Sequence, residues 1–396
     1  MKHLVLLYDG MADLPCDALG GKTPMEAARK PLFDALGRDA EVGLVQTVAP
    51  GMKPGSDVAN LSVLGYDPAL YYTGRSPLEA ASIGVEIGEN DLTLRCNLVT
   101  LSAEEPYAAK TMLDYSGGDI GTAEAAELIA VVQAALGTEE FIFYPGVAYR
   151  HCLLWKGGRK HLTDLGTLTP PHDITGQPVT GQLPAGAAAA PLLRMMEQSA
   201  ALLRVRRANS IWLWGEGTRP ALPDFYKTFG KRGSIISAVD LLKGIGLLAG
   251  LRTPAVEGAT GYIDTNYEGK ARRAVAEFQA GQDFVYLHME ASDECGHRGE
   301  AANKVRAIEL PDERVLPTVL EYLGHCGEAY AILILPDHPT PLVTRTHSRD
   351  AVPYMLYRSS DAGSGKGVAA VTEAAAAGTG NYIANGPDLI RRFFAE

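Results

Sequence analysis

The sequence predicts an α/β fold, with a doubly wound, mostly parallel sheet and a smaller α+β domain inserted into it. Three short and almost continuously apolar runs are typical of buried parallel strands, and an aspartate follows each within a few residues. These runs are Leu4–Tyr8, Phe284–Met289 and Ala329–Leu335. Ligands of open α/β sheets bind beyond the carboxyl ends of the strands, so Asp9, Asp293 and Asp337 mark the expected site.

The segments between these strands have apolar residues at the spacing of helices. The predicted helices cover residues 26–36, 237–251 and 304–323. Pro311 and Pro317 would interrupt the third of them, because proline cannot continue a helix without losing a hydrogen bond.

The middle of the chain shows no apolar strand followed by a ligand-type aspartate. It contains short β-like runs, including 141–144 and 152–155, and later an alanine-rich linker at 185–190. We therefore expect a second domain inserted into the first. Its expected bounds are 76–208, which leaves a discontinuous main domain over 1–75 and 209–396.

Composition limits the classes of function. The 396 residues are 46% hydrophobic and 21% charged, which is ordinary for a globular protein of two or three domains. A net charge of -11 makes nucleic acid or an acidic membrane an unexpected partner. No apolar run reaches the roughly 18 residues of a membrane span, and Asp9 interrupts the first run too early for a signal peptide. Five scattered cysteines without a C-x-x-C pair favour reduced thiols in a cytoplasmic protein.

Histidines accompany two of the strand-end aspartates. Asp337 and His338 are adjacent, so both can reach one ion or two neighbouring ions. Asp293 and His297 have the i, i+4 spacing that places two side chains on one face of a helical turn. No local pattern marks His347, and it is a candidate ligand only because the other candidate ligands are present. Each fragment alone could be an ordinary turn or surface loop, and only the combination indicates a metal site.

Ser56 is the candidate nucleophile. It follows a predicted strand over 42–48 and precedes the apolar Val58 and Leu61, so we expect it at the start of a helix. Backbone N–H groups at that place favour an anion, although the serine could also be a plain helix cap. Aspartate and histidine together suit Zn²⁺ or Mn²⁺, and coordination would lower the pKa of the serine hydroxyl. The pattern indicates a two-metal enzyme that transfers a phosphoryl group.

These stretches resemble the alkaline-phosphatase superfamily and, within it, the cofactor-independent phosphoglycerate mutases of the shorter archaeal type. The likeness keeps the same order along nearly the whole chain. The residues that carry it are Asp9–Asp13, Pro54–Pro68, Gly74–Ala80, Ile236–Gly246, Asp293–His297, Asp337–His338 and His347. The second and fourth of these stretches are the most specific to this branch.

The resemblance implies a transiently phosphorylated Ser56 and two divalent metal ions, with no 2,3-bisphosphoglycerate. Mn²⁺ is the first choice of ion, and Zn²⁺, Mg²⁺ or Co²⁺ are alternatives. One ion would be held by Asp9, Ser56, Asp337 and His338, and the other by Asp293, His297 and His347. Lys243 matches a family lysine near the serine, which could neutralise the phosphoryl oxygens.

The resemblance also implies that the inserted domain binds the substrate, and here the chain departs from the family. Asp119 stands where the family usually has a histidine that helps to hold the substrate phosphate. An aspartate there would repel phosphate unless it is protonated or paired. His172 and Asp173 loosely resemble a family loop that brings acid–base and substrate groups to the cleft. The arginines available to grip the substrate carboxylate are Arg95, Arg150 and Arg159.

The resemblance implies the interconversion of 3-phosphoglycerate and 2-phosphoglycerate, so the expected partner is a small phosphorylated hydroxy acid. Asp119 leaves a second phosphoryl acceptor possible, since an aspartate could bind an ammonium group. The chain could then be a phosphotransferase that acts on another hydroxyl compound such as homoserine. A plain phosphatase or phosphodiesterase would use the same metal ligands and release free phosphate. A binding protein without activity is the remaining possibility. The sequence leaves the oligomeric state open.

Overall fold

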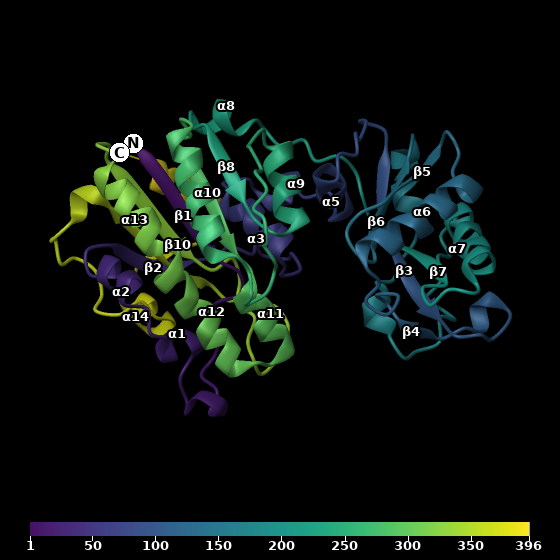
Figure 1. The fold of residues 1–396 in the computed structure, drawn as a ribbon, viewed down its shortest axis with the longest axis horizontal. Coiled ribbons are helices and arrows are strands. Elements are labelled where there is room, and N and C mark those ends of the chain that lie inside the picture. The colour runs from purple at the N-terminus through teal and green to yellow at the C-terminus, as the bar shows by residue number, and fades with distance from the viewer. Residues whose placement is uncertain (396) are drawn as a thin grey trace. The chain divides into compact units, whose positions relative to one another are not determined.

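The computed structural model describes residues 1–395, which form two compact units. The first unit comprises Met1–Tyr72 and the chain from Leu222 onwards, and the second comprises Thr73–Ala221 (Figure 1). The bounds of the second unit lie outside the predicted 76–208, and its assignment as a substrate-binding domain stays a prediction. No helix within residues 1–395 has the length and apolar character needed to cross a bilayer.

The first unit is built on a seven-stranded sheet in the order β12-β2-β11-β10-β1-β9-β8. Its strands are β1 (Lys2–Tyr8), β2 (Glu41–Val45), β8 (Gly233–Ile236), β9 (Phe284–Met289), β10 (Tyr330–Leu335), β11 (Val352–Arg358) and β12 (Tyr382–Ile383). The central strands β10, β1, β9 and β8 run parallel, and β11 is antiparallel to both of its neighbours. The predicted α/β fold with a mostly parallel sheet is confirmed.

Prolines divide the helices of the first unit. These helices are α1 (Pro24–Ala27), α2 (Pro31–Gly37), α3 (Ser56–Val63), α4 (Pro68–Tyr71), α8 (Phe225–Phe229), α9 (Asp240–Leu248), α10 (Tyr267–Gln279), α11 (Ala291–Arg298), α12 (Ala301–Arg314), α13 (Leu316–His325), α14 (Glu373–Gly378) and α15 (Pro387–Phe394). The prediction of one helix over 26–36 is wrong, because Pro31 begins a separate helix. The predicted 304–323 does break near Pro317, in the first turn of α13, whereas Pro311 lies inside α12.

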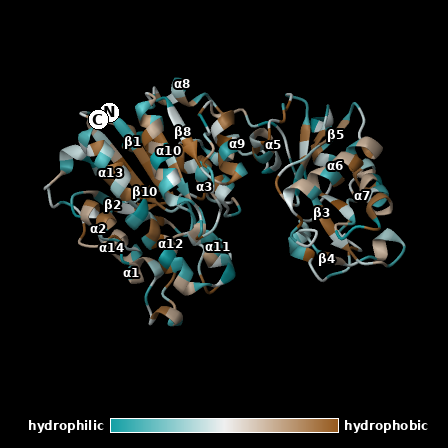
Figure 2. Cartoon of the chain, viewed as in Figure 1, coloured by the Kyte–Doolittle hydropathy of each residue, from teal (hydrophilic) through white to brown (hydrophobic). Residues whose placement is uncertain are grey.

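Helices cover both faces of the sheet, which explains why the central strands are apolar throughout. On one face Leu4 and Leu6 of β1 share a core with Phe278 of α10 and with residues of α12 and α13. The other face meets α3, where Tyr286 of β9 donates a hydrogen bond to Asn60. Figure 2 shows the resulting band of hydrophobic residues along the central strands.

The second unit is an antiparallel α+β domain. Its strands are β3 (Leu92–Leu101), β4 (Met112–Asp114), β5 (Phe141–Tyr144), β6 (Arg150–Trp155) and β7 (Ser210–Gly217). β3 pairs with β4, β6 and β7, and β5 pairs with β6. Its helices are α5 (Ser76–Ser82), α6 (Thr122–Leu136) and α7 (Ala190–Leu203). A separate core that includes Ile129, Met196 and Trp212 joins α6 and α7 to the strands.

Candidate metal centre

The parallel strands bring three aspartates to one edge of the first unit's sheet. The register of β1 with β9 and β10 leaves the carboxyl ends of the three strands level. Asp9 directly follows β1, Asp337 follows β10, and Asp293 lies in the first turn of α11, after β9. Gly10 turns the chain with a φ of 61°, and a Cβ at this position would lie 2.6 Å from Asp293 Oδ1. Glycine is therefore required for this close approach.

Asp9, Asp337 and His338 form an enclosed set of side chains, which we call the buried group. Each of the three side chains is 3% exposed or less. His338 Nε2 lies 3.4 Å from Asp337 Oδ2 and 3.7 Å from Asp9 Oδ1. Ser56 Oγ lies 3.2 Å from the same nitrogen. The four residues predicted for the first ion thus lie around one point, and their binding of an ion stays a prediction.

Asp293, His297 and His347 form a second set, which we call the loop group. His297 Nε2 lies 3.2 Å from Asp293 Oδ2, and His347 Nε2 lies 3.3 Å from Asp293 Oδ1. The two Nε2 atoms are 2.9 Å apart. His297 is 35% and His347 is 20% exposed. Ligand atoms of His338, Asp293 and His347 also lie within 4.8 Å of one another, so His338 stands between the two groups.

These residues fit divalent cations. Asp9 Oδ1 is buried and has no hydrogen-bond partner within residues 1–395, which is unfavourable for a carboxylate oxygen unless an ion binds it. His297 Nε2 and His347 Nε2 face each other at 2.9 Å. At this distance the two nitrogens must have a proton between them or a cation bound to both. The mixture of carboxylate and imidazole donors matches Zn²⁺ or Mn²⁺.

Crowded carboxylates strongly perturb the ionisation of these side chains. Burial, together with the charges of Asp337 and Asp293, raises the pKa of Asp9 well above its usual value. Burial also opposes ionisation of Asp293, but hydrogen bonds from His297 and His347 outweigh it and hold that pKa well below its usual range. Asp293 in turn raises the pKa of His297 to about 9. A divalent cation would offset the repulsion between the carboxylates.

Ser56 is the first residue of α3, at the helix start that the sequence predicted. Asn60, one turn later, was not predicted as a site residue. Its Nδ2 donates to the carbonyl of Ser56 and to Asp337 Oδ2, both at 2.8 Å. Tyr286 donates its hydroxyl to Asn60 Oδ1 at 2.5 Å, which fixes the amide orientation. The sequence signals for Asn60 were its i, i+4 spacing from Ser56 and its place in the family-like stretch Pro54–Pro68.

Thr340 and Lys304 hold the loop after β10, and neither was predicted. Thr340 Oγ1 donates to Asp293 Oδ1 at 2.5 Å and lies 3.3 Å from His338 Nδ1. Lys304 Nζ is buried and donates to Asp13 Oδ2 and to the Thr340 carbonyl, each at 2.7 Å. No sequence pattern identifies these two residues, because the folded chain sets their partners.

Lys243, predicted to act near the serine, lies in α9 with its Nζ 3.3 Å from Asp240 Oδ1. Its side chain is 30% exposed. Within residues 1–395, no hydrogen bond or ion pair joins it to Ser56. Its proposed contact with phosphoryl oxygens therefore stays a prediction.

The candidate substrate residues of the second unit are largely exposed. Asp119 has a φ of 55°, and its carboxylate forms no ion pair with any described residue. His172 and Asp173 are neighbours in one helical turn, with Nε2 3.4 Å from Oδ1. Arg150 begins β6 and stacks over the ring of Tyr149 at 5.0 Å. The structure joins His172 to Asp173, and no described hydrogen bond or ion pair joins Asp119 to Arg150 or to that pair.

Three arginines gather around one carboxylate in the second unit. Nε of Arg75 and Nε of Arg95 each lie 2.8 Å from a different oxygen of Glu79. Burial raises the pKa of Glu79, but Arg95, Arg75 and Arg150 outweigh it and hold that pKa below its usual value. Arg75 was missed as a candidate, although it lies in one of the family-like stretches. Arg159 is instead bonded to a backbone carbonyl at 2.9 Å.

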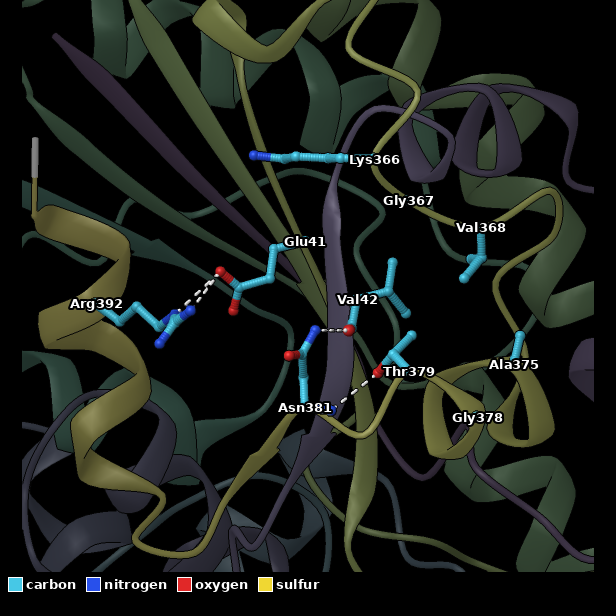
Figure 3. Close-up of a pocket in the computed structure, with 10 residues that line it drawn as sticks. All are labelled: Glu41, Val42, Lys366, Gly367, Val368, Ala375, Gly378, Thr379, Asn381 and Arg392. Atoms are coloured by element: carbon cyan, nitrogen blue, oxygen red, sulfur yellow. Dashed lines mark hydrogen bonds and ion pairs between the residues drawn. The ribbon is translucent and has the colours of Figure 1, made fainter.

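Figure 3 shows a pocket at the opposite edge of the first unit's sheet. It lies beside Glu41 and Val42, at the amino end of β2, which runs in the same direction as β1. Arg392 is paired with Glu41 at 2.7 Å, and Lys366 with Asp361 at 2.8 Å. Its charged groups are thus already paired, and none of the predicted site residues lines it.

Proteins of similar sequence cover nearly the whole chain. The family described as 2,3-bisphosphoglycerate-independent phosphoglycerate mutase matches residues 38–209. A protein of Geobacter sulfurreducens, named a probable 2,3-bisphosphoglycerate-independent phosphoglycerate mutase, is 49% identical over 398 residues and covers 98% of both chains. The 2,3-bisphosphoglycerate-independent phosphoglycerate mutase of Methanothrix thermoacetophila is 46% identical over 410 residues and covers 100% of both.

Two solved structures share the fold. The PH0037 protein from Pyrococcus horikoshii matches with a TM-score of 0.81 and 25% identity, and covers 100% of this chain and 98% of its own. The cofactor-independent phosphoglycerate mutase from Thermoplasma acidophilum matches with a TM-score of 0.64 and 24% identity over 100% of both chains. The second likeness supports the fold alone.

Proposed function

The chain belongs to the 2,3-bisphosphoglycerate-independent phosphoglycerate mutases, and we propose that it acts through a phosphoserine at Ser56 beside two divalent metal ions. As a member of this family it interconverts 3-phosphoglycerate and 2-phosphoglycerate, so it is an isomerase that moves a phosphoryl group within its substrate. The observation that supports the proposed mechanism best is the position of Ser56 Oγ, 3.2 Å from His338 Nε2 in the buried group.

Seven side chains are proposed to hold the ions. The first ion takes Asp9, Ser56, Asp337 and His338, and the second takes Asp293, His297 and His347. Bound ions would lower the pKa of the serine hydroxyl and offset charge on the phosphoryl oxygens. Mn²⁺ is the proposed ion, and Zn²⁺, Mg²⁺ or Co²⁺ could occupy the same mixed donor set.

Ser56 attacks the phosphoryl group in line with the bond that breaks. Its place at the start of α3 directs backbone N–H groups toward an anion. Asn60 holds the carbonyl of Ser56 and so fixes the backbone of the nucleophile. Glycerate must then stay bound and attack the phosphoserine through its other hydroxyl, because water in its place would release free phosphate.

The arginines of the second unit are the proposed ligands of the substrate carboxylate. Arg75 and Arg95 each form an ion pair with Glu79, and the charge of Arg150 also helps to lower the pKa of this carboxyl, so positive charge is concentrated here. Arg95 is further fixed by stacking over Trp214, with its guanidinium 4.2 Å from the ring centroid. A positioned guanidinium can bind a carboxylate through two hydrogen bonds.

A second candidate acceptor follows from Asp119. Its exposed carboxylate forms no ion pair with any described residue, so it could bind the ammonium group of an acceptor such as homoserine. An arginine lies next to this turn, however. A Cβ at Gly118 would lie 2.0 Å from Arg207 Nε, so this guanidinium packs against the backbone beside Asp119. That arrangement favours a phosphate over an amine, which supports the mutase.

The test is a coupled assay of 3-phosphoglycerate turnover by protein that has been stripped of metal and reloaded with Mn²⁺. We expect Ser56→Ala to lose activity by about 10³-fold or more, because alanine lacks the hydroxyl that is proposed to attack the phosphoryl group. Ser62→Ala is the matched control, since Ser62 is buried on the same helix and contacts no proposed ligand. Turnover by Ser56→Ala at the rate of the control would exclude the phosphoserine. Transfer of the phosphoryl group from 3-phosphoglycerate to added homoserine, with release of glycerate and no 2-phosphoglycerate formed, would favour the second candidate.

A further inference from the structure

Asp9 is held by a buried histidine that no sequence motif revealed. His288 lies in β9, in register with Leu7 of β1, and its side chain is fully buried. Its Nε2 lies 2.9 Å from Asp9 Oδ2. The other ring nitrogen, Nδ1, lies 3.0 Å from Ser237 Oγ. His288 therefore connects a proposed metal ligand to a serine that follows β8.

Asp9 must be ionised to bind a cation, and in that state the hydrogen bonds define which ring nitrogen of His288 carries the proton. The N–H of Val239 donates to Ser237 Oγ at 3.0 Å, so the hydroxyl proton of that serine is free to point at His288 Nδ1. Nδ1 then accepts, and Nε2 carries the ring proton and donates it to the Asp9 carboxylate. The opposite tautomer would leave a nitrogen lone pair facing a carboxylate oxygen.

This chain of hydrogen bonds gives a partner to only one of the two carboxylate oxygens of Asp9. Oδ2 accepts from His288, whereas Oδ1 is buried without a partner among residues 1–395. Oδ1 is the oxygen that lies 3.7 Å from His338 Nε2 and so faces the rest of the buried group. The carboxylate is thus oriented with one oxygen reserved for an ion.

We propose that His288, held by Ser237, is a positioning residue that orients Asp9 for metal binding. The inference rests on the proposed metal ligands. It goes beyond them because it gives a role to His288 and Ser237, which are not proposed to bind the ion themselves. Ser237 belongs to the family-like stretch Ile236–Gly246, for which the sequence suggested only Lys243 as a functional residue. Partners of this kind orient a ligand and tune its basicity without touching the metal.

Two substitutions at one position separate orientation from packing. The shorter amide of His288→Asn can keep the contact with Ser237 but does not reach Asp9. The longer amide of His288→Gln places an N–H near the former Nε2 and can keep the contact with Asp9. We expect His288→Asn to weaken one of two Mn²⁺ sites by about 10- to 100-fold, and His288→Gln to weaken it less.

The measurement is calorimetric titration of the full-length, metal-stripped protein with MnCl₂, with circular dichroism as the check of folding. Equal affinities in His288→Asn and the parent protein, or equal losses in both substitutions, would overturn the inference. If His288→Asn does not fold, Ser237→Ala decides, because it keeps His288 and should weaken the same site severalfold. Unchanged binding in that variant would overturn the inference. A parent protein without Mn²⁺ binding would overturn the proposed ligands as well.

Discussion

The two halves of the metal centre are built in different ways. The buried group stands at strand ends, and its side chains are 3% exposed or less. The loop group is formed by a helix and the segment after β10, and its imidazoles are 35% and 20% exposed. Asp337 accepts from Gly10 N, His338 N and Asn60 Nδ2. Buried donors thus fix this carboxylate before any ion arrives.

The histidines of the loop group have fewer partners. His297 Nδ1 faces the carbonyl of Arg345 at 2.9 Å, and its Nε2 faces His347 and Asp293. His297 is therefore held by this carbonyl and by Asp293, and His347 by Asp293 and by packing on His338, with the ring centroids 4.0 Å apart. The comparison indicates that buried donors from other elements hold the carboxylate of Asp337, whereas the proposed ligands of the loop group are held mainly by one another. Substituting one proposed ligand of each group should therefore reduce the affinity for Mn²⁺ by different amounts.

The largest effect is expected from Asp337→Asn. An amide in this place cannot accept from all three donors, and it removes a charged ligand from a fully buried site. We expect the affinity for one Mn²⁺ to fall by more than about 100-fold, which exceeds the usual effect of losing an outer partner.

A smaller effect is expected from His347→Asn in the loop group. The affinity for one Mn²⁺ should fall about tenfold, because water can replace a ligand at an exposed position. Calorimetric titration with MnCl₂ measures both, and equal losses would remove the distinction between the groups.

An intermediate effect is expected from pH at the loop group. Asp293 raises the pKa of His297 to about 9, so this imidazole is protonated at neutral pH when no ion is bound. A metal ligand must be neutral, hence binding releases the proton and the apparent affinity falls by about tenfold per pH unit below that pKa. Titrations at pH 8 in two buffers of different ionisation enthalpy count the protons released. The parent should release about one proton more than His297→Asn, and equal counts would contradict the assignment.

The smallest effect is expected from Thr340→Val, which keeps the shape of the side chain. It removes the hydrogen bond to Asp293 Oδ1, worth about 1 kcal/mol, or roughly fivefold in affinity for the second ion. Thr344→Val is the control, since its hydroxyl bonds only backbone carbonyls of its own loop. A loss as large as that of Asp337→Asn would show that the loop group is as firmly preorganised as the buried group.

Local patterns were sufficient to predict where the strand-end aspartates and Ser56 would lie in the fold. An apolar run followed by an aspartate identified Asp9 and Asp337, and the start of an amphipathic helix identified Ser56. Both patterns depend only on neighbours in the sequence, so they can be recognised without knowledge of the fold. His347 had no such pattern and was included only because the other candidate ligands supported it, and the structure places its Nε2 2.9 Å from that of His297.

The supporting residues could not be predicted. His288 sits in an apolar strand and looks like a core residue, yet it contacts Asp9 from the neighbouring strand. Lys304 and Thr340 likewise look like ordinary helix and loop residues. Their roles arise from contacts between segments far apart in the chain, which no local spacing encodes.

Burial patterns, helix starts and ligand chemistry leave local signatures, so they were sufficient to assign the fold class and the family and to propose the metal ligands. The folded chain was needed to show which of the proposed ligands are held by buried donors and which are exposed. Parallel pairing sets the three strand ends level, and this register brings buried donors from other strands and helices onto Asp9 and Asp337.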